Sequence, residues 1–203
     1  MPTAPLVRRG TSVRRRRCVE EQGPKRKLTT ILCADCVAYS RLMRADEEGT
    51  YRLLQTCRHV IAQVTGEHEG RVFGGAGDSV VAEFPSPVEA VRAAVEIQQS
   101  IAGLGAEVAE DQRMQFRIGI NLGDVIIEGD DLIGDGVNVA ARLQGLAEPG
   151  GICISASVHE QVRGKLTVAW NDLGNQTVKN IAEPVRAFRA QVGRPPVEHS
   201  GQL

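Results

Sequence analysis

Hydrophobic and polar residues alternate along the chain with two different periods, which predict strands and helices in turn. Residues 28–36 (LTTILCADC) are apolar and β-branched, as is typical of a buried strand, and they contain one carboxylate near the end, Asp35. Apolar positions then recur with the helical period through residues 41–64, which predicts one long helix. The first strand therefore brings an acidic side chain to its C-terminal end.

Two apolar runs on either side of a glycine-rich turn predict a β-hairpin. Residues 71–73 and 79–84 are the strands, and the turn GGAGD between them ends at Asp78, a second carboxylate at a strand start. The segment SPVE at 86–89 has the pattern of a capping box with proline at the first helical position. A helix is therefore expected from there to near Gly103.

The stretch after the second helix combines apolar strands with glycine and aspartate. Residues 117–122 predict a buried strand, a turn follows at 123–124, and residues 125–127 predict a strand paired back on the first. A Gly/Asp-rich turn then leads into a helix that carries Asn138 and Arg142, and residues four apart lie on one helix face. Because a helix N-terminus attracts anions, the amide and the guanidinium indicate phosphate chemistry.

The expected order is strand, helix, strand, strand, helix, strand, followed by a hairpin arm and short C-terminal strands. This order predicts a mixed α/β (α+β) fold of the ferredoxin-like split βαβ type. Its sheet would be mainly antiparallel, with helices on one face and a C-terminal extension. The domain should span residues 28–192, between a disordered basic tail at 1–27 and a short tail at 193–203.

Composition narrows the class of protein. The 203 residues are 42% hydrophobic, which suffices for one domain with a buried core. Residues 1–27 hold nine of the 24 basic side chains and two acids, so residues 28–203, with 15 basic and 23 acidic side chains, carry a net charge of −8. An acidic body with 3% aromatic residues is a poor nucleic-acid binder. A nucleic-acid module that uses the basic tail is the least favoured interpretation.

The cysteines and the lengths of the apolar runs indicate the cellular compartment of the protein. No apolar run reaches the roughly 18 residues of a membrane span, and no apolar stretch after Arg8 and Arg9 makes a signal peptide. Five cysteines, an odd number, indicate a reducing compartment, so we expect a cytoplasmic protein. Cys33-x-x-Cys36 has redox or zinc spacing, but no second such pair exists. Buried strand cysteines are the better interpretation.

The two strand-end carboxylates suggest a metal site. The split βαβ order places the strands of Asp35 and Asp78 side by side, and carboxylates that project together repel unless a cation separates them. Oxygen ligands suit Mg²⁺ or Mn²⁺, and two such ions commonly serve phosphoryl transfer. The alternative is that both aspartates are turn residues that accept hydrogen bonds from backbone amides.

Five segments of the chain, in order and at family spacing, resemble the catalytic domain of the class III nucleotidyl cyclases, the adenylate and guanylate cyclase family. They are ILCADCVAYSRLM, RVFGGAGDSVVAEF, FRIGINLGDVI, GDGVNVAARL and EPGGICIS. The match extends over residues 28 to about 190 and is strongest with bacterial members.

The resemblance implies a role for each matching residue. Asp35 and Asp78 would hold two Mg²⁺ or Mn²⁺ ions, joined by the backbone carbonyl that follows Asp35, at Cys36. Asn138 would orient the ribose, and Arg142 would stabilise charge in the transition state.

The resemblance also implies how the base and the phosphates are recognised. Asp131, seven positions before Asn138, would read the purine, and aspartate there goes with adenine. Lys179, in the segment TVKNIAEP, would contact a phosphate. A purine-binding lysine is expected four residues before the second metal aspartate, but Gly74 stands there. One hydrogen bond to the base is thereby lost, at a cost of about 1–3 kcal/mol.

Members of this family work as head-to-tail dimers, in which one protomer supplies the aspartates and the other the purine, ribose and transition-state residues. Because this chain carries both sets, the resemblance implies a homodimer with two equivalent sites. The expected activity is conversion of ATP to 3′,5′-cyclic AMP and pyrophosphate, with GTP as an open alternative. The other hypothesis, supported by Gly74, is a catalytically degenerate domain that binds nucleotide or regulates a partner.

Overall fold

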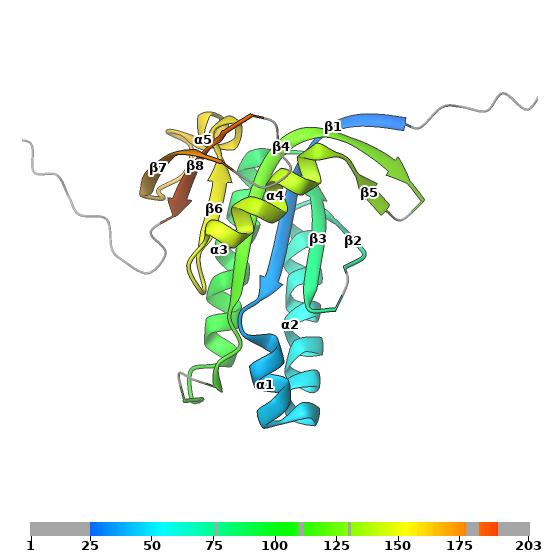
Figure 1. The fold of residues 1–203 in the computed structure, drawn as a ribbon, viewed down its shortest axis with the longest axis vertical. Coiled ribbons are helices and arrows are strands. Elements are labelled where there is room, and N and C mark those ends of the chain that lie inside the picture. The colour runs from blue at the N-terminus through cyan, green and yellow to red at the C-terminus, as the bar shows by residue number, and fades with distance from the viewer. Residues whose placement is uncertain (1–24, 76, 110–111, 130, 178–182, 191–203) are drawn as a thin grey trace, which may run out of the picture.

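The computed structural model describes residues 25–75, 77–109, 112–129, 131–177 and 183–190. They form an eight-stranded, mostly antiparallel sheet in the order β2-β3-β1-β4-β6-β8-β7, with β5 paired to β4 (Figure 1). The strands are β1 Lys25–Cys36, β2 Arg71–Phe73, β3 Ser79–Phe84, β4 Phe116–Glu128, β5 Asp131–Ile133, β6 Ile152–Ser155, β7 Trp170–Gln176 and β8 Val185–Ala190. The helices are α1 Tyr39–Ala45, α2 Glu47–Glu67, α3 Pro87–Leu104, α4 Asp135–Leu146 and α5 Ala156–Val162. Within the described ranges, no helix has both the length and the apolar character needed to cross a membrane.

The sheet has helices on both faces. Side chains alternate along a strand, so Leu32 and Cys36 of β1 point into the main core with α2, α3 and α5, whereas Ile31 and Cys33 point to α4. Figure 1 shows α4 crossing one face of the sheet while α2 and α3 cover the other. The predicted α+β fold is confirmed, and the order β2-β3-β1-β4 is that of the split βαβ unit. The expected one-sided arrangement of helices holds for α2, α3 and α5 but not for α4.

The turn predicted at residues 123–124 is wrong, because β4 continues through it as one strand. This strand pairs with β1 without a break, as far as Lys25 opposite Ile127. The hairpin arm forms later, between the end of β4 and β5. The long pairing also includes Lys25, Arg26 and Lys27, which the sequence assigned to the N-terminal tail.

Glycines in this stretch serve close packing and not a turn. A Cβ at Gly123 would lie 3.0 Å from the Cα of Gly136 in α4. At Gly119, a Cβ would lie 2.1 Å from the carbonyl oxygen of Ala140, also in α4. The absence of side chains at these positions therefore lets the backbone of α4 lie directly against the sheet.

The long helix predicted over residues 41–64 is two helices, α1 and α2, which separate at Asp46. This residue is extended, with φ −153° and ψ 99°, and its carboxylate accepts a hydrogen bond from the backbone N–H of Gly49 at 3.0 Å. An N-cap of this kind starts a new helix, because it satisfies one of the free donors of the first turn.

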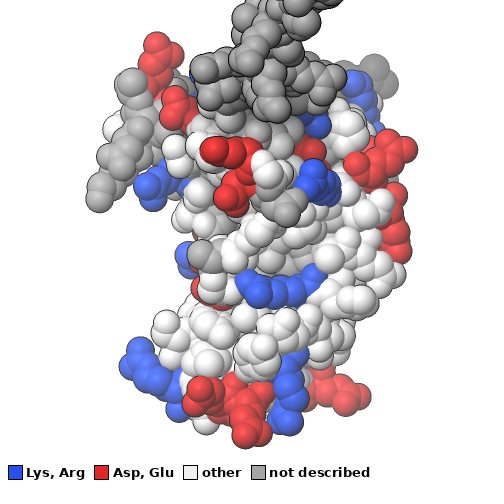
Figure 2. All heavy atoms as spheres, turned by 90° about the vertical axis from the view of Figure 1, so that its right-hand side faces the viewer, with Lys and Arg blue, Asp and Glu red and all other residues white. Residues whose placement is uncertain are grey.

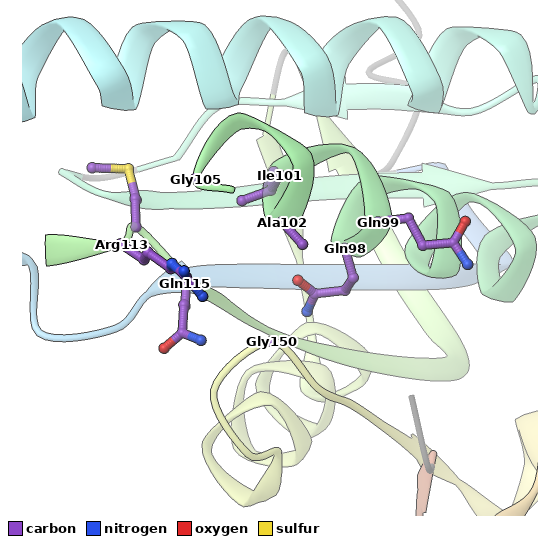
Figure 3. A pocket seen from close by; sticks show the side chains of 9 residues that line it. Gln98, Gln99, Ile101, Ala102, Gly105, Arg113, Gln115 and Gly150 are labelled. Atoms are coloured by element: carbon purple, nitrogen blue, oxygen red, sulfur yellow. The ribbon is translucent and has the colours of Figure 1, made fainter. Parts of the chain in front are cut away.

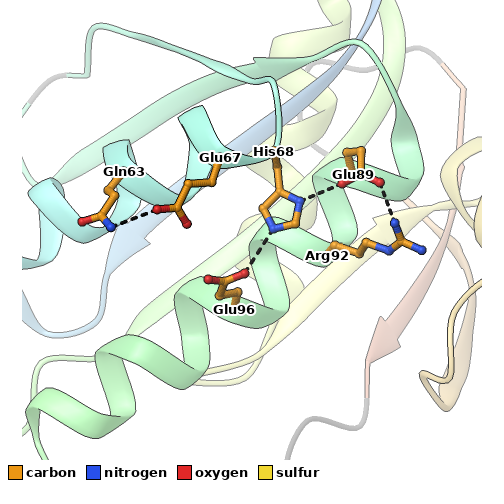
Figure 4. Close-up of polar contacts among 6 residues, drawn as sticks. All are labelled: Gln63, Glu67, His68, Glu89, Arg92 and Glu96. Carbon is orange, nitrogen blue, oxygen red and sulfur yellow. Dashed lines mark hydrogen bonds and ion pairs between the residues drawn. The ribbon is translucent and has the colours of Figure 1, made fainter.

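A histidine between two glutamates joins the end of α2 to α3 (Figure 4). Nδ1 of His68 lies 2.7 Å from Glu89, and Nε2 lies 3.1 Å from Glu96. Glu89 also accepts a hydrogen bond from Arg92 at 2.7 Å, and Ser86 makes no side-chain cap, so the predicted capping box does not form. Burial by itself lowers the pKa of His68, but the hydrogen bonds to the two glutamates outweigh it and the net shift is upward.

We expect His68→Gln to lower the free energy of unfolding by about 1 kcal/mol near pH 6 and by much less near pH 9. The folded-state pKa is raised above the ordinary value of 6.5, so the stabilisation is full below that value and is lost as pH rises through the folded-state pKa. Denaturant unfolding of both proteins at the two pH values measures the difference. His59→Gln, at an exposed position of α2, is the control. An equal loss at both pH values would contradict a charged His68.

Cysteines in the described residues are all buried free thiols: Cys33, Cys36, Cys57 and Cys153. Cys33 and Cys36 point to opposite faces of the sheet, so their spacing makes no joint site. Burial raises the pKa of both thiols to about 12, and for Cys36 the nearby Asp78 adds to the effect. Both therefore stay protonated and inert, as expected for buried strand cysteines.

Candidate active site

Asp35 and Asp78 lie beside each other at one end of the sheet. β1 pairs with β3 in a register that puts Asp35 opposite Ser79, and Asp78 directly precedes Ser79. Burial raises the pKa of Asp35, and the nearby carboxylate of Asp78 raises it further. The fold thus brings the two predicted carboxylates together in a half-buried place where their charges repel.

Arg117, at the same end of the sheet, was missed as a site residue from the sequence. It lies opposite Asp35 in the register of β1 and β4, and its charge partly offsets the upward shift of that carboxylate's pKa. Its Nε is buried and has no hydrogen-bond partner among the described residues. The alternation of side chains along β4 could have revealed it. Phe116 and Ile118 point into the main core, so Arg117 between them lies on the other face of the sheet.

Asn138 and Arg142 lie on the exposed side of α4, as their spacing predicts. The opposite side of the helix is buried against the sheet through Gly136, Ala140 and Leu143. In the part of the chain that the structure describes, neither side chain has a hydrogen-bond or ion-pair partner. Both are therefore available to a ligand.

Asn121 of β4, inside the motif FRIGINLGDVI, holds the first turn of α4 on the sheet. Its Nδ2 donates a hydrogen bond to the carbonyl oxygen of Gly136 at 3.1 Å, and the amide is buried. Nearby, Sγ of Cys33 lies 3.9 Å from the carbonyl oxygen of Val137. The helical turn that carries Asn138 is thus positioned by the sheet beneath it.

The other predicted site residues are placed as follows. Asp131 is exposed at the start of β5, opposite Glu128 of β4. Gly74 is exposed in the turn after β2. The thiol of Cys36 points into the main core. Lys179 lies outside the described residues.

The two residue sets are not joined within one copy of the chain. Among the described residues, no hydrogen bond or ion pair links either aspartate to Asn138 or Arg142. The described ranges also hold no group of three or more side chains suited to ligate a metal. Asp35 belongs to the face of the sheet that α4 covers, because it is two residues along β1 from Cys33, which packs against α4.

A cavity of about 350 Å³ lies elsewhere, between α3 and the start of β4 (Figure 3). None of the predicted site residues lines it. Gln98 in its wall is buried, and its Nε2 donates to the carbonyl oxygens of Phe116 and Gly151, each at 2.9 Å. This amide joins α3 to the sheet, and the residues that line the cavity are not those of the candidate site.

Charged side chains of both signs are mixed over the face seen in Figure 2, at its upper and lower ends, and the middle is mostly uncharged. Basic residues at the start of β1 are paired locally: Arg26 with Asp124 at 2.8 Å, and Lys27 with Glu83 at 3.1 Å. That face therefore presents no continuous basic surface.

The chain belongs to the family of the adenylate and guanylate cyclase catalytic domain, whose model matches residues 22–189. A protein of Rhizobium meliloti (strain 1021) named "Putative adenylate cyclase 3" is 47% identical over 165 residues. The aligned part covers 81% of this chain but 28% of that relative, so the chain spans little more than a quarter of the relative's length.

Solved structures agree with this assignment. An adenylate/guanylate cyclase/hydrolase from Silicibacter pomeroyi has a TM-score of 0.77 and 38% identity, covering 82% of this chain and 97% of that one. The adenylyl cyclase CyaB from P. aeruginosa, at TM-score 0.73 and 22% identity, covers 84% and 96%. The guanylyl cyclase Cya2, at TM-score 0.72 and 23% identity, covers 85% and 96%. Because adenylyl and guanylyl cyclases share the fold equally, the fold does not select the base.

Proposed function

We propose that the domain converts ATP to 3′,5′-cyclic AMP and pyrophosphate at a site shared by two copies of the chain. The observation that carries the proposal is that one chain holds both residue sets and yet, among the described residues, no hydrogen bond or ion pair joins them within a copy. A head-to-tail homodimer would bring the aspartates of one copy to α4 of the other, twice. Family membership supports the class of reaction, and the name of the Rhizobium meliloti relative supports adenine.

Asp35 and Asp78 would hold two divalent cations, Mg²⁺ or Mn²⁺. The donor set fits such ions: the two carboxylates lie side by side, burial and the charge of Asp78 raise the pKa of Asp35, and the backbone carbonyl of Cys36, the next residue along the chain, would add a hard oxygen. When bound, the cations neutralise charge on the triphosphate and lower the pKa of the ribose 3′-hydroxyl. The nucleotide's phosphate oxygens would complete the ligand set.

Residues of α4 and β4 would act on the reacting groups. Asn138 would orient the ribose so that its 3′-oxygen faces the α-phosphorus. Arg142 would donate to the α-phosphoryl oxygens, where charge builds as the bond to the 3′-oxygen forms and the bond to pyrophosphate breaks. The buried, unpaired Nε of Arg117 supports a contact with the departing phosphates, and Lys179 would add another. Asp131 would accept a hydrogen bond from the adenine amino group.

Product identification tests the proposal. The purified protein is incubated with Mn²⁺ and either ATP or GTP, and the nucleotides are separated and identified by mass spectrometry. We expect 3′,5′-cyclic AMP from ATP at a higher rate than cyclic GMP from GTP. Binding of ATP with no cyclic product would favour the degenerate nucleotide-binding domain.

We expect Gly74→Lys to raise kcat/KM for ATP by about tenfold to a hundredfold, and by less for GTP. Lysine would restore a donor where the family pattern has one, beside the proposed acceptor Asp131. The structure leaves room, because an added Cβ at Gly74 meets nothing within 4 Å, and among the described residues of this turn the positive φ, 65°, belongs to Gly77. Initial rates with both nucleotides, and the melting temperature, measure the outcome.

Gly75→Lys is the matched control for that variant. Its Cβ would lie 2.1 Å from the carbonyl oxygen of Ser79, so this protein should lose stability and activity together. A Gly74→Lys protein that melts at the wild-type temperature but gains no ATP selectivity would mean that other residues read the purine.

A further inference from the structure

The turn that carries Asp78 ends where the hydrogen-bonded ladder of the sheet begins. β3 pairs with β1 from Ser79 onward, so Asp78 lies just outside the ladder. On the other side of the turn, β2 has three residues and forms the edge of the sheet. Gly77 has a φ of 65°, which glycine adopts far more readily than other residues. The ladder between β1 and β3 therefore does not itself include Asp78.

Arg58 of α2 contacts the chain around Asp78. Its Nη2 donates to the carbonyl oxygens of Gly77 and Ser79, the residues on either side of Asp78, and the second bond is 3.4 Å long. Helix α2 lies behind the hairpin in Figure 1, so the guanidinium reaches the turn from the face of the sheet that α2 and α3 cover. Within the described ranges no carboxylate pairs with Arg58, and its Nε is buried without a partner. Its described hydrogen bonds all go to these two carbonyl groups.

We propose that Arg58 is a positioning residue for the aspartate pair: it holds the carbonyl groups of Gly77 and Ser79, the residues before and after Asp78, and so keeps the Asp78 carboxylate beside Asp35 before a cation binds. The inference rests on the proposed function, in which the two aspartates hold the cations. A planar guanidinium suits the task, because it carries several donors in a fixed arrangement, whereas a lysine ammonium is a point charge on a flexible stem. Loss of Arg58 leaves Asp78 chemically intact but poorly placed, so it weakens cation binding.

Mn²⁺ binding tests this role without turnover. The full chain is titrated with Mn²⁺ in the presence of 3′-deoxy-ATP, which lacks the attacking hydroxyl, and free Mn²⁺ is measured by electron paramagnetic resonance. We expect the dissociation constant to rise about tenfold in Arg58→Ala and about threefold in Arg58→Lys. Arg52→Ala, at an exposed position of the same helix, is the control and should leave it unchanged.

A positioning role for Arg58 predicts a large effect on Mn²⁺ affinity and a small effect on kcat, whereas a direct role in the reaction predicts a large effect on kcat. At saturating Mn²⁺, kcat of Arg58→Ala with ATP should fall by no more than about threefold, because bound cations restore the carboxylate geometry. In an Asp78→Asn background, Arg58→Ala should have no further effect on Mn²⁺ binding, because the carboxylate that it positions is gone.

Two results overturn the inference: equal Mn²⁺ affinity in wild type and folded Arg58→Ala, or a further loss of affinity when Arg58→Ala is added to Asp78→Asn. If Arg58→Ala does not fold, Arg58→Lys carries the same two comparisons. A wild-type protein that binds no Mn²⁺ and forms no cyclic nucleotide overturns the proposed function and this inference together.

Discussion

Asp78→Asn should reduce cyclic nucleotide formation by at least about 100-fold, with Mg²⁺ and Mn²⁺ alike. Loss of a group that only hydrogen-bonds to a metal ligand commonly costs about 10- to 100-fold in affinity or activity, and loss of the ligand itself should cost more. Asparagine has the shape of aspartate but no charge, so the change opens no cavity. The fold should be kept, since Asp78 is half-exposed and its side chain makes no hydrogen bond among the described residues. Initial rates over a range of cation concentrations, and the melting temperature, measure the two effects.

The pKa of Asp35 gives an independent readout of the same variant. After burial, the charge of Asp78 is the largest cause of the raised pKa of Asp35. Asp78→Asn should therefore lower the pKa of Asp35, which an NMR titration of the cation-free protein follows. Glu83→Gln, on the same strand and paired with Lys27, is the control and should change neither turnover nor this pKa. Unchanged turnover in Asp78→Asn would contradict the two-cation mechanism.

Asp35→Ala and Arg142→Ala should each be inactive alone and should regain about a quarter of the wild-type activity when mixed in equal amounts. Random exchange makes half of the dimers mixed, and in each mixed dimer one of the two sites is wholly wild type. The other site carries both changes. Activity is measured after exchange, which fluorescence energy transfer between labelled copies follows.

A mixture of Asp35→Ala with Asp78→Ala is the control for this experiment. Both changes then fall in the aspartate set, so every site lacks one carboxylate and no activity should return. If Asp35→Ala and Arg142→Ala also stay inactive together, although exchange is demonstrated, the site is not built across two copies.

The sequence predicted correctly those strands and helices that are bounded by clear turn residues or that have a regular helical period. The hairpin of β2 and β3 lies where its glycine-rich turn placed it, at residues 71–73 and 79–84. Helix α4 likewise carries Asn138 and Arg142 on its exposed side, because the helical period alone decides which residues share a face.

Two secondary-structure predictions were wrong: the turn at residues 123–124 and the single helix over residues 41–64. Gly123 looks like a turn residue, but it is glycine because α4 passes 3.0 Å from where its Cβ would be. Asp46 lies inside a helical pattern, and only the hydrogen bond from its carboxylate to Gly49 shows that one helix ends and another begins there. In both cases the local pattern is compatible with two structures, and packing selects one.

For the candidate site, the sequence by itself was enough to propose the two residue sets, because the motifs that carry Asp35, Asp78, Asn138 and Arg142 are local and keep their spacing. Only the tertiary structure decided that α4 covers the face opposite the other helices, since a period of two groups residues by face without saying what covers each face. It also decided the position of Arg117, which strand register sets opposite Asp35, and that of Arg58, which contacts a hairpin about 20 residues away along the chain. Contacts of that kind leave no trace in local periodicity, because neither partner changes the pattern around the other.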